Sequence, residues 1–138
     1  MKKQFLCILF MFLAHLSVAQ DADAIIGIWE IESGESHVQI YKKEGQYFGK
    51  IHWIKNPKKR TATDKNNPDP QFRNRSILGL EIITDLQYKG GEWVNGKIYS
   101  PERGSETPCK FSLESSNQLK ITVSKGFMSK GQTWKRVK

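Results

Sequence analysis

The chain has 138 residues, of which 22 are Lys or Arg and 14 are Asp or Glu, so its formal charge is +8. A chain of this length fits one domain and is long enough to bury a hydrophobic core. It contains only two cysteines, Cys7 and Cys109, which excludes a small fold held together by several disulfides.

The first nineteen residues have the pattern of a secretory signal. Lys2 and Lys3 provide a positive start, an apolar run follows over residues 5–13, and small residues end the segment at Ala19. The apolar run is too short for a spanning helix, which needs about 20 residues. We expect cleavage after Ala19, which leaves one domain of 119 residues (20–138) with a formal charge of +6. We expect this domain to be a monomer without a membrane span, located in the periplasm or outside the cell.

The rest of the chain alternates between β-forming runs and turn sequences at short spacing, which is typical of an all-β barrel or sandwich. The alternation is clearest where Leu119, Ile121 and Val123 share one face. In chain order, we expect strands at 27–32, 37–41, 47–54, 76–86, 92–99, 109–113, 119–123 and 133–137.

Residues 57–72 interrupt this rhythm, because they are polar, contain three prolines and have no strand pattern. A loop of this length in a small domain is usually either functional or disordered. In the strand that follows it, we expect Leu78, Leu80, Ile82 and Leu86 to alternate on the buried face.

Eight strands joined mostly by hairpins can form an antiparallel meander that closes on itself and leaves no free edge. We therefore predict an all-β, eight-stranded, antiparallel lipocalin-like (calycin) barrel with one long loop between the third and fourth strands. A β-sandwich is the alternative. Gly27 and Trp29 open the first strand, and Trp134 and Arg136 lie in the last. This resembles the lipocalin pattern in which a basic side chain covers an indole ring, so we interpret these four residues as structural.

Several blocks carry a more specific resemblance. The sequence reads DKNNPD at 64–69, RNRSILG at 73–79, GKIYSP at 96–101 and TWKRV at 133–137. Together they resemble the bacterial exported family named domain of unknown function 2147. The resemblance covers residues 27–137 and implies a secreted or periplasmic protein with a calycin-like barrel, but no activity. The chain departs from the family pattern at Ser100, where an acid is common, and at Glu106-Thr107, where Thr-Tyr is typical. A function that depends on an acid at position 100 is therefore in doubt.

The long loop and its flanks contain the best candidate site. If the segment is extended, Arg73 and Arg75 point to one side and can clamp a carboxylate, a phosphate or a sulfated sugar. Alternatively, Asp64 and Asp69 pair with these arginines, and the asparagines cap turns that lock the loop over the barrel mouth. The candidate ligand-binding residues are Asp64, Asn66, Asn67, Asp69, Arg73, Arg75 and, from its proximity in the family pattern, Tyr99.

Other chemistry finds little support. His37 and His52 lie on different expected strands outside any ligand-spaced motif, so we predict no metal site and no cofactor. The sequence contains no Gly-x-Ser-x-Gly elbow and no glycine-rich phosphate loop. Seven basic and two acidic residues between Lys55 and Arg75 give this stretch a local charge of +5. In an exported protein, such a cluster suits an anionic envelope component better than nucleic acid.

Two main functions are compatible with these observations. The first is an exported, small-ligand-binding or envelope-associated lipocalin-like protein whose loop binds an anionic partner. The alternative is an enzyme that acts on an anionic small molecule, with Asp64 as acid or base and Arg73 and Arg75 holding the substrate. A scaffolding protein is a third reading. The missing nucleophile and metal motifs favour binding over catalysis.

Overall fold

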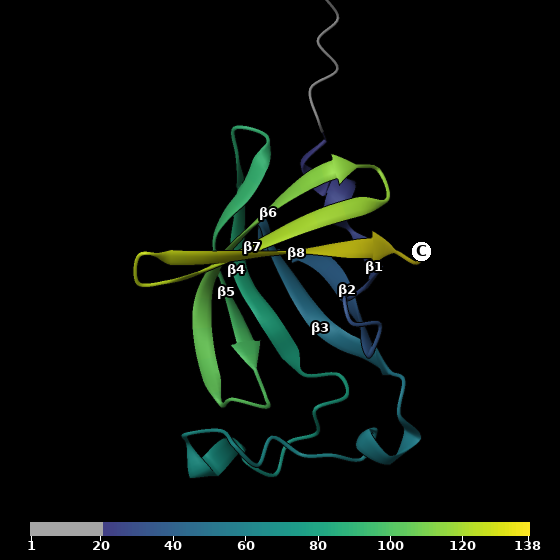
Figure 1. Ribbon diagram of the computed structural model, residues 1–138, viewed down its shortest axis with the longest axis vertical. Helices are drawn as coiled ribbons and strands as arrows, with labels where there is room; N and C mark the ends of the chain where they lie inside the picture. Colours follow the sequence, from purple (N-terminus) through teal and green to yellow (C-terminus); the bar gives the residue numbers. More distant parts are fainter. Residues whose placement is uncertain (1–20) are drawn as a thin grey trace, which may run out of the picture.

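The computed structural model describes residues 21–138, so the predicted signal sequence at 1–19 lies outside the described residues. Eight strands form a closed barrel with short 3-10 helices beside it (Figure 1). The strands are β1 (Gly27–Glu30), β2 (Ser36–Lys43), β3 (Gln46–Ile54), β4 (Glu81–Lys89), β5 (Glu92–Ser100), β6 (Ser105–Ser115), β7 (Gln118–Lys125) and β8 (Met128–Arg136), and the short helices are η1 (Ala22–Ile25), η2 (Pro57–Lys59) and η3 (Pro70–Phe72).

Each strand pairs antiparallel with the next along the chain, and β1 pairs with β8 to close the barrel. The seam between β1 and β8 is short, and its register places Trp29 opposite Arg136 and Glu30 opposite Lys135. The predicted eight-stranded antiparallel barrel with one long loop between β3 and β4 is therefore confirmed. The β-sandwich alternative is wrong.

The fourth strand differs from the prediction in where it begins and in which residues it buries. It begins at Glu81 rather than near residue 76, and Ser76 instead forms an isolated bridge with Thr63 inside the loop. Leu78 is 38% exposed, so it does not share the buried face with the residues that follow. The β3–β4 pairing contains register irregularities, and both Ile82 and its neighbour Ile83 are buried. A strict alternation cannot bury two consecutive residues, so the alternating pattern gave the wrong set of buried residues at the start of this strand.

Large aromatic side chains fill much of the barrel interior. Trp29, Tyr47, Trp93, Phe111 and Trp134 are each at most 2% exposed. A barrel of eight strands has room either for packed side chains or for one small ligand. Since these rings occupy the interior, a ligand site is expected toward the mouth of the barrel and not at its centre.

The helix η1 closes one end of the barrel by accepting hydrogen bonds from two buried indoles. The Nε1–H of Trp29 donates to the carbonyl oxygen of Ile25 at 2.9 Å, and the Nε1–H of Trp93 donates to that of Ala22 at 2.9 Å. A buried indole N–H needs such a partner. These bonds therefore attach η1 to the core residues beneath it.

Arg136 covers the same end from the last strand. Its guanidinium lies 4.2 Å from the centre of the Trp29 ring, and it donates hydrogen bonds to the carbonyl oxygens of Ile26 and Ala24. Gly27 has a φ of 147°, and a Cβ there would lie 2.6 Å from Nη1 of Arg136. The same Cβ would lie 2.6 Å from the backbone oxygen of Lys138, which cannot move aside as a side-chain end can, so position 27 requires a glycine.

The loop between β3 and β4, residues 55–80, runs across the opposite end of the barrel from η1 (Figure 1). Its two 3-10 turns begin with Pro57 and Pro70, and the side chains of Asn56 and Asp69 cap them. Proline at the first helical position and a short polar cap both stabilise such a turn. Neither these turns nor any other helix of the described residues is long and apolar enough to cross a membrane.

Candidate functional site

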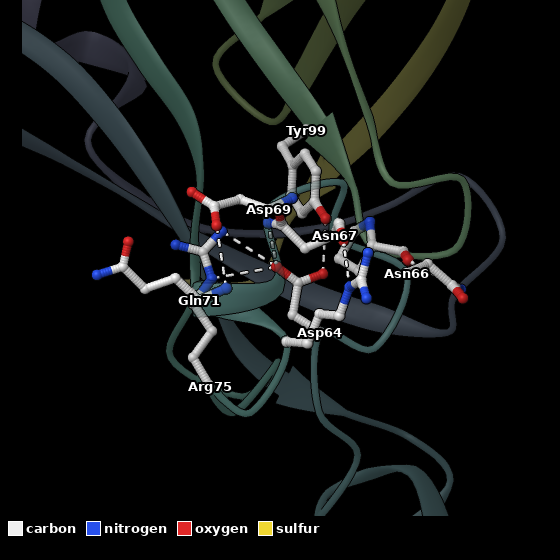
Figure 2. A network of polar contacts seen from close by, with 9 residues as sticks. Asp64, Asn66, Asn67, Asp69, Gln71, Arg75 and Tyr99 are labelled. Atoms are coloured by element: carbon white, nitrogen blue, oxygen red, sulfur yellow. Dashed lines mark hydrogen bonds and ion pairs between the residues drawn. The ribbon is translucent and has the colours of Figure 1, made fainter.

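The carboxylate of Asp64 is the centre of a hydrogen-bond network in the long loop (Figure 2). Asp64 is fully buried. Its Oδ1 accepts a hydrogen bond from the Tyr99 hydroxyl at 2.6 Å, and its Oδ2 accepts from Asn67 Nδ2 at 2.9 Å and Arg75 Nε at 3.1 Å. Arg75 also places Nη2 3.1 Å from Oδ2. A buried charge with this many donors is compensated and not free to react.

Backbone bonds hold the two arms of the loop together around this carboxylate. The N–H of Asp64 donates to the carbonyl of Arg75 at 3.0 Å, and the N–H of Ile77 donates to that of Ala62 at 3.1 Å. The N–H of Asn67 in turn donates to the carbonyl of Asp64 at 3.0 Å. The loop is therefore a bonded ribbon with a tight turn at its tip.

The loop also docks onto the β5–β6 hairpin, at Asn66 and Gly104. The Asn66 amide donates to the carbonyl oxygens of Pro101 at 3.4 Å and Glu102 at 3.0 Å. Gly104 has a φ of 62°, and a Cβ there would lie 1.9 Å from the backbone oxygen of Asn66. Only a residue without a side chain allows the two backbones to come this close.

The network also sets the protonation of its two acidic groups. Burial by itself raises the pKa of the Asp64 carboxyl, but hydrogen bonds from Tyr99, Asn67 and Arg75 outweigh it, so this pKa lies below its usual value of 3.8. Burial and the bond to Asp64 raise the pKa of Tyr99 to about 12. At neutral pH, Asp64 is therefore anionic and Tyr99 is a neutral donor.

A pocket of about 460 Å³ lies between the loop, the start of β4 and the β5–β6 hairpin. Its apolar surface includes the buried side chains of Leu80 and Ile82 and the ring of Phe72, which is 42% exposed. Arg75 is its one lining cation, with a side chain that is 40% exposed. The lining residues are Asn67, Pro68, Asp69, Phe72, Arg75, Leu80, Glu81, Ile82, Thr84, Tyr99, Gly104 and Glu106.

The comparison with known proteins agrees with this architecture. The family model described as "Uncharacterized protein conserved in bacteria (DUF2147)" matches residues 27–136. The chain belongs to this family. Among solved structures, it is similar to protein HP1028 from the human pathogen Helicobacter pylori, which belongs to the lipocalin family. The two share 27% identity with a TM-score of 0.75, and the match covers 82% of each chain. A comparison with curated proteins finds no match.

The family resemblance predicted from the motif blocks is thereby confirmed, and in this DUF2147 member three of the four blocks meet at the loop, whereas TWKRV supplies Arg136 at the closed end. DKNNPD contributes Asp64, Asn66 and Asn67, RNRSILG contributes Arg75, and GKIYSP contributes Tyr99. GKIYSP is far from the other two blocks in sequence, yet all three supply a partner to the same buried carboxylate or its hairpin contact. Their spacing reflects the assembly of one loop structure.

The predicted site residues fall into two groups. Asn67, Asp69, Arg75 and Tyr99 line the pocket, whereas Asp64, Asn66 and Arg73 are not among its lining residues. The second group holds the loop together. Asp64 is the centre of the network described above, Asn66 bonds to the β5–β6 hairpin, and Arg73 Nε donates to the Asn67 carbonyl at 2.8 Å.

The predicted clamp of two arginines on one extended segment is wrong. Arg73 ends the 3-10 turn η3 with helical backbone angles, and the chain bends at Arg75. The two guanidinium groups therefore have different partners, Asn67 for the first and Asp64 for the second. The alternative in which Asp64 pairs with an arginine describes Arg75 correctly. Asp69 does not pair with Arg73 but caps η3 by accepting from the N–H of Gln71 at 3.0 Å.

Sequence reasoning missed the apolar half of the pocket. The sequence pattern places Phe72 in the loop and Leu80 and Ile82 on the buried face of a strand, it gives no role to Glu81 or Thr84, and it marks Glu106 only as a departure from the family pattern. The proximity of Phe72 to the DKNNPD block was a usable signal, since an exposed aromatic next to polar residues is common in binding sites. The contribution of β4 had no such signal, because it depends on where the loop folds back.

Two other groups capable of chemistry, His37 and Cys109, are engaged or buried, whereas His52 is exposed on β3. His37 contacts Glu30 at 3.3 Å and lies against the ring of Trp53. Cys109 is buried, and burial raises the pKa of its thiol to about 12. Within residues 21–138, no group of three or more His, Cys, Asp or Glu side chains is placed to hold a metal ion.

Proposed function

We propose that this protein is a ligand-binding lipocalin-like protein whose ligand occupies the pocket beneath the long loop. The observation that carries the proposal is a 460 Å³ pocket on a lipocalin-like barrel, bordered by a loop that the Asp64 network holds in place. Small-molecule sites usually have 300–1,000 Å³, a largely apolar lining and a few fixed polar groups. The network thus serves to pre-organise one wall of the site, which lowers the entropic cost of binding.

The lining favours an amphipathic ligand. Its apolar body would pack against Phe72, Leu80 and Ile82, and its head would accept a hydrogen bond from Arg75. Two nitrogens of Arg75 already contact Asp64, which leaves Nη1 without a hydrogen-bond partner among the described residues. This nitrogen is the natural donor to a ligand oxygen.

The charges of the lining residues restrict which anionic head groups the pocket can bind. Asp69, Glu81 and Glu106 carry negative charge around the pocket, and Asp64 largely neutralises its one cation, Arg75. A phosphate or a sulfated sugar would meet like charges there. We therefore propose a head of low charge, such as a single carboxylate, an ester or an amide.

The enzyme alternative has less support. Asp64 would have to exchange a proton with a substrate, yet it is fully buried and both of its oxygens accept hydrogen bonds from protein donors. Its lowered pKa also makes it a weak base at neutral pH. These features suit a structural anion better than a catalytic one.

We also propose that the protein works in the periplasm or outside the cell, as its first nineteen residues predict. Expression through its own leader, followed by mass spectrometry of the protein that the cell accumulates, tests this directly. Loss of residues 1–19 is the expected result. A mass that retains them, in protein found with the cytoplasm, would contradict export.

Binding is tested with a dansylated fatty acid, which combines an apolar chain, a carboxylate and a fluorescent reporter. Titration into the wild-type protein should raise and blue-shift its emission. Phe72→Ala removes one apolar wall and should weaken binding about tenfold. The matched control is Phe127→Ala, because Phe127 is 102% exposed and lies outside the pocket.

The head group is tested by competition with the same probe. Decanoic acid should displace it more effectively than decyl phosphate, because the phosphate carries more negative charge into a site bordered by three carboxylates. Equal binding of the probe to both phenylalanine variants would place the site elsewhere. Absence of binding to the wild-type protein, together with a bare mass in native mass spectrometry, would contradict the ligand-binding proposal.

A further inference from the structure

The turn between β7 and β8 exposes two large apolar side chains to solvent. Phe127 is 102% exposed and Met128 is 70% exposed. Lys125 and Lys130 flank them, and the register pairs Lys125 with Met128. We call residues 125–130 the hairpin tip. A single exposed apolar residue is ordinary in a soluble protein, but two adjacent ones at the end of a hairpin are less so.

The hairpin tip extends beyond the paired part of the barrel (Figure 1). The register of β6 with β7 runs as far as Val123, which lies opposite Cys109. The register of β1 with β8 involves Lys135 and Arg136, at the other end of β8. Beyond Val123, β7 pairs only with β8, through Ser124 opposite Ser129 and Lys125 opposite Met128. The tip is therefore presented outward, at the edge of the molecule.

The charge of the protein is concentrated in the same part of the chain. Residues 21–114 contain 14 basic and 14 acidic residues, whereas residues 115–138 contain six basic residues and no acid. The whole formal charge of +6 of the described residues thus belongs to the β7–β8 hairpin and its flanks. Arg136 is bonded to backbone oxygens at the closed end, and the other five are the lysines at 120, 125, 130, 135 and 138.

The long loop is a weaker candidate for an anionic surface, although its sequence is also basic. Its three arginines fold back onto the protein: Arg60 donates to the Ile54 carbonyl at 2.7 Å, and Arg73 and Arg75 are engaged within the loop. The loop also has no exposed pair of apolar residues adjoining, along the chain, its lysines at 55, 58, 59 and 65. The long loop therefore lacks the pair of exposed apolar side chains flanked by lysines that the hairpin tip has.

We propose that the hairpin tip inserts Phe127 and Met128 into the headgroup region of an anionic lipid bilayer, while Lys125 and Lys130 contact the lipid phosphates. An aromatic side chain and a flexible thioether gain free energy by leaving water at this depth, and flanking lysines are attracted by the negative surface. A soluble acidic polysaccharide would attract the lysines but would offer no apolar layer to the tip. The exposed Phe127 and Met128 therefore favour a membrane. The protein associates with the surface through this turn without crossing the bilayer.

The experiment is co-sedimentation of the protein with lipid vesicles. The protein is purified from an exporting host in the form that the cell accumulates. One set of vesicles contains phosphatidylglycerol and phosphatidylcholine in equal parts, and the other contains phosphatidylcholine alone. The wild-type protein should sediment with the anionic vesicles and remain in solution with the neutral ones, and added salt should release it.

Paired variants distinguish the contribution of the hairpin tip to vesicle binding from that of the rest of the surface. Phe127→Ala should weaken partitioning about tenfold, whereas Leu78→Ala on the long loop, outside the pocket, should leave it unchanged. Each of Lys125→Gln and Lys130→Gln should weaken it about fivefold. The control for these is Lys58→Gln, which removes the same charge from the long loop. All of these side chains are exposed, and circular dichroism verifies that each variant is folded.

Three results would overturn the proposal. The first is no sedimentation of the wild-type protein with anionic vesicles at low salt. The second is sedimentation that Phe127→Ala does not weaken, or that Lys58→Gln weakens as much as Lys125→Gln. The third is binding to dextran sulfate with the same dependence on Phe127, which would identify an acidic polysaccharide as the partner. None of these results bears on the pocket, whose ligand is tested by the dansylated fatty acid.

Discussion

The hydroxyl of Tyr99 offers a direct test of how far the Asp64 network stabilises the protein. Tyr99→Phe removes the donor to Oδ1 of Asp64 and keeps the ring. Because Asp64 is fully buried, water does not replace this donor. A hydrogen bond to a charged group contributes about 1.5–3 kcal/mol, and an unsatisfied buried acceptor adds to the loss. We expect the free energy of unfolding to fall by about 2–3 kcal/mol.

The matched control is Tyr47→Phe, because Tyr47 and Tyr99 each donate a hydrogen bond to an aspartate but the two aspartates differ in how far they are buried. The Tyr47 hydroxyl donates to Oδ1 of Asp23 at 2.5 Å, but the Asp23 side chain is 45% exposed and also contacts Lys42 at 3.2 Å. Water can replace the lost hydroxyl there, so this variant should be far less destabilised.

Urea unfolding followed by tryptophan fluorescence measures both variants, because three of the four indoles are buried in the core. Tyr99→Phe should lower the midpoint urea concentration with an unchanged slope. The midpoint temperature of thermal unfolding should fall by about 10 °C. Equal losses in the two variants would refute the reasoning, because they would show that burial of the acceptor does not set the strength of the bond.

Three further predictions concern the same framework. Gly104→Ala should destabilise more than Gly126→Ala, because both glycines have positive φ near 62° but only the first would bring a Cβ within 1.9 Å of the Asn66 backbone; urea midpoints compare them. The folded-state pKa of Asp64 lies below 3.8, so its contribution is present above that pH and is lost as the pH falls through the folded pKa; Asp64→Asn should make the acid limb of the stability profile shallower. Arg136→Lys should cost about 2 kcal/mol in urea unfolding, because an ammonium cannot reproduce the guanidinium fork on the backbone oxygens, and a loss below about 0.5 kcal/mol would contradict this.

Much of the barrel could be predicted from local pattern. Alternation at Leu119, Ile121 and Val123 determines which face is buried, because successive strand residues point to opposite sides. Turn pairs such as Gly90-Gly91 mark where the chain reverses, since glycine adopts the positive φ that the turn requires. The prediction failed at the start of β4, where register irregularities bury Ile82 and Ile83 together and local alternation no longer holds.

The sequence by itself also determined which residue types gather in the long loop, and it indicated that Asp64 and an arginine could pair. Only the tertiary structure decided that Arg75 is the partner, that Tyr99 is the third donor, and that Arg73 turns away. Tyr99 lies 35 positions from Asp64, so their contact depends on how the loop docks on the β5–β6 hairpin. The same dependence applies to the pocket and to the hairpin tip. Which side chains line the pocket and which are exposed at the hairpin tip depends on segments that meet in space, and a pattern along the chain does not contain this information.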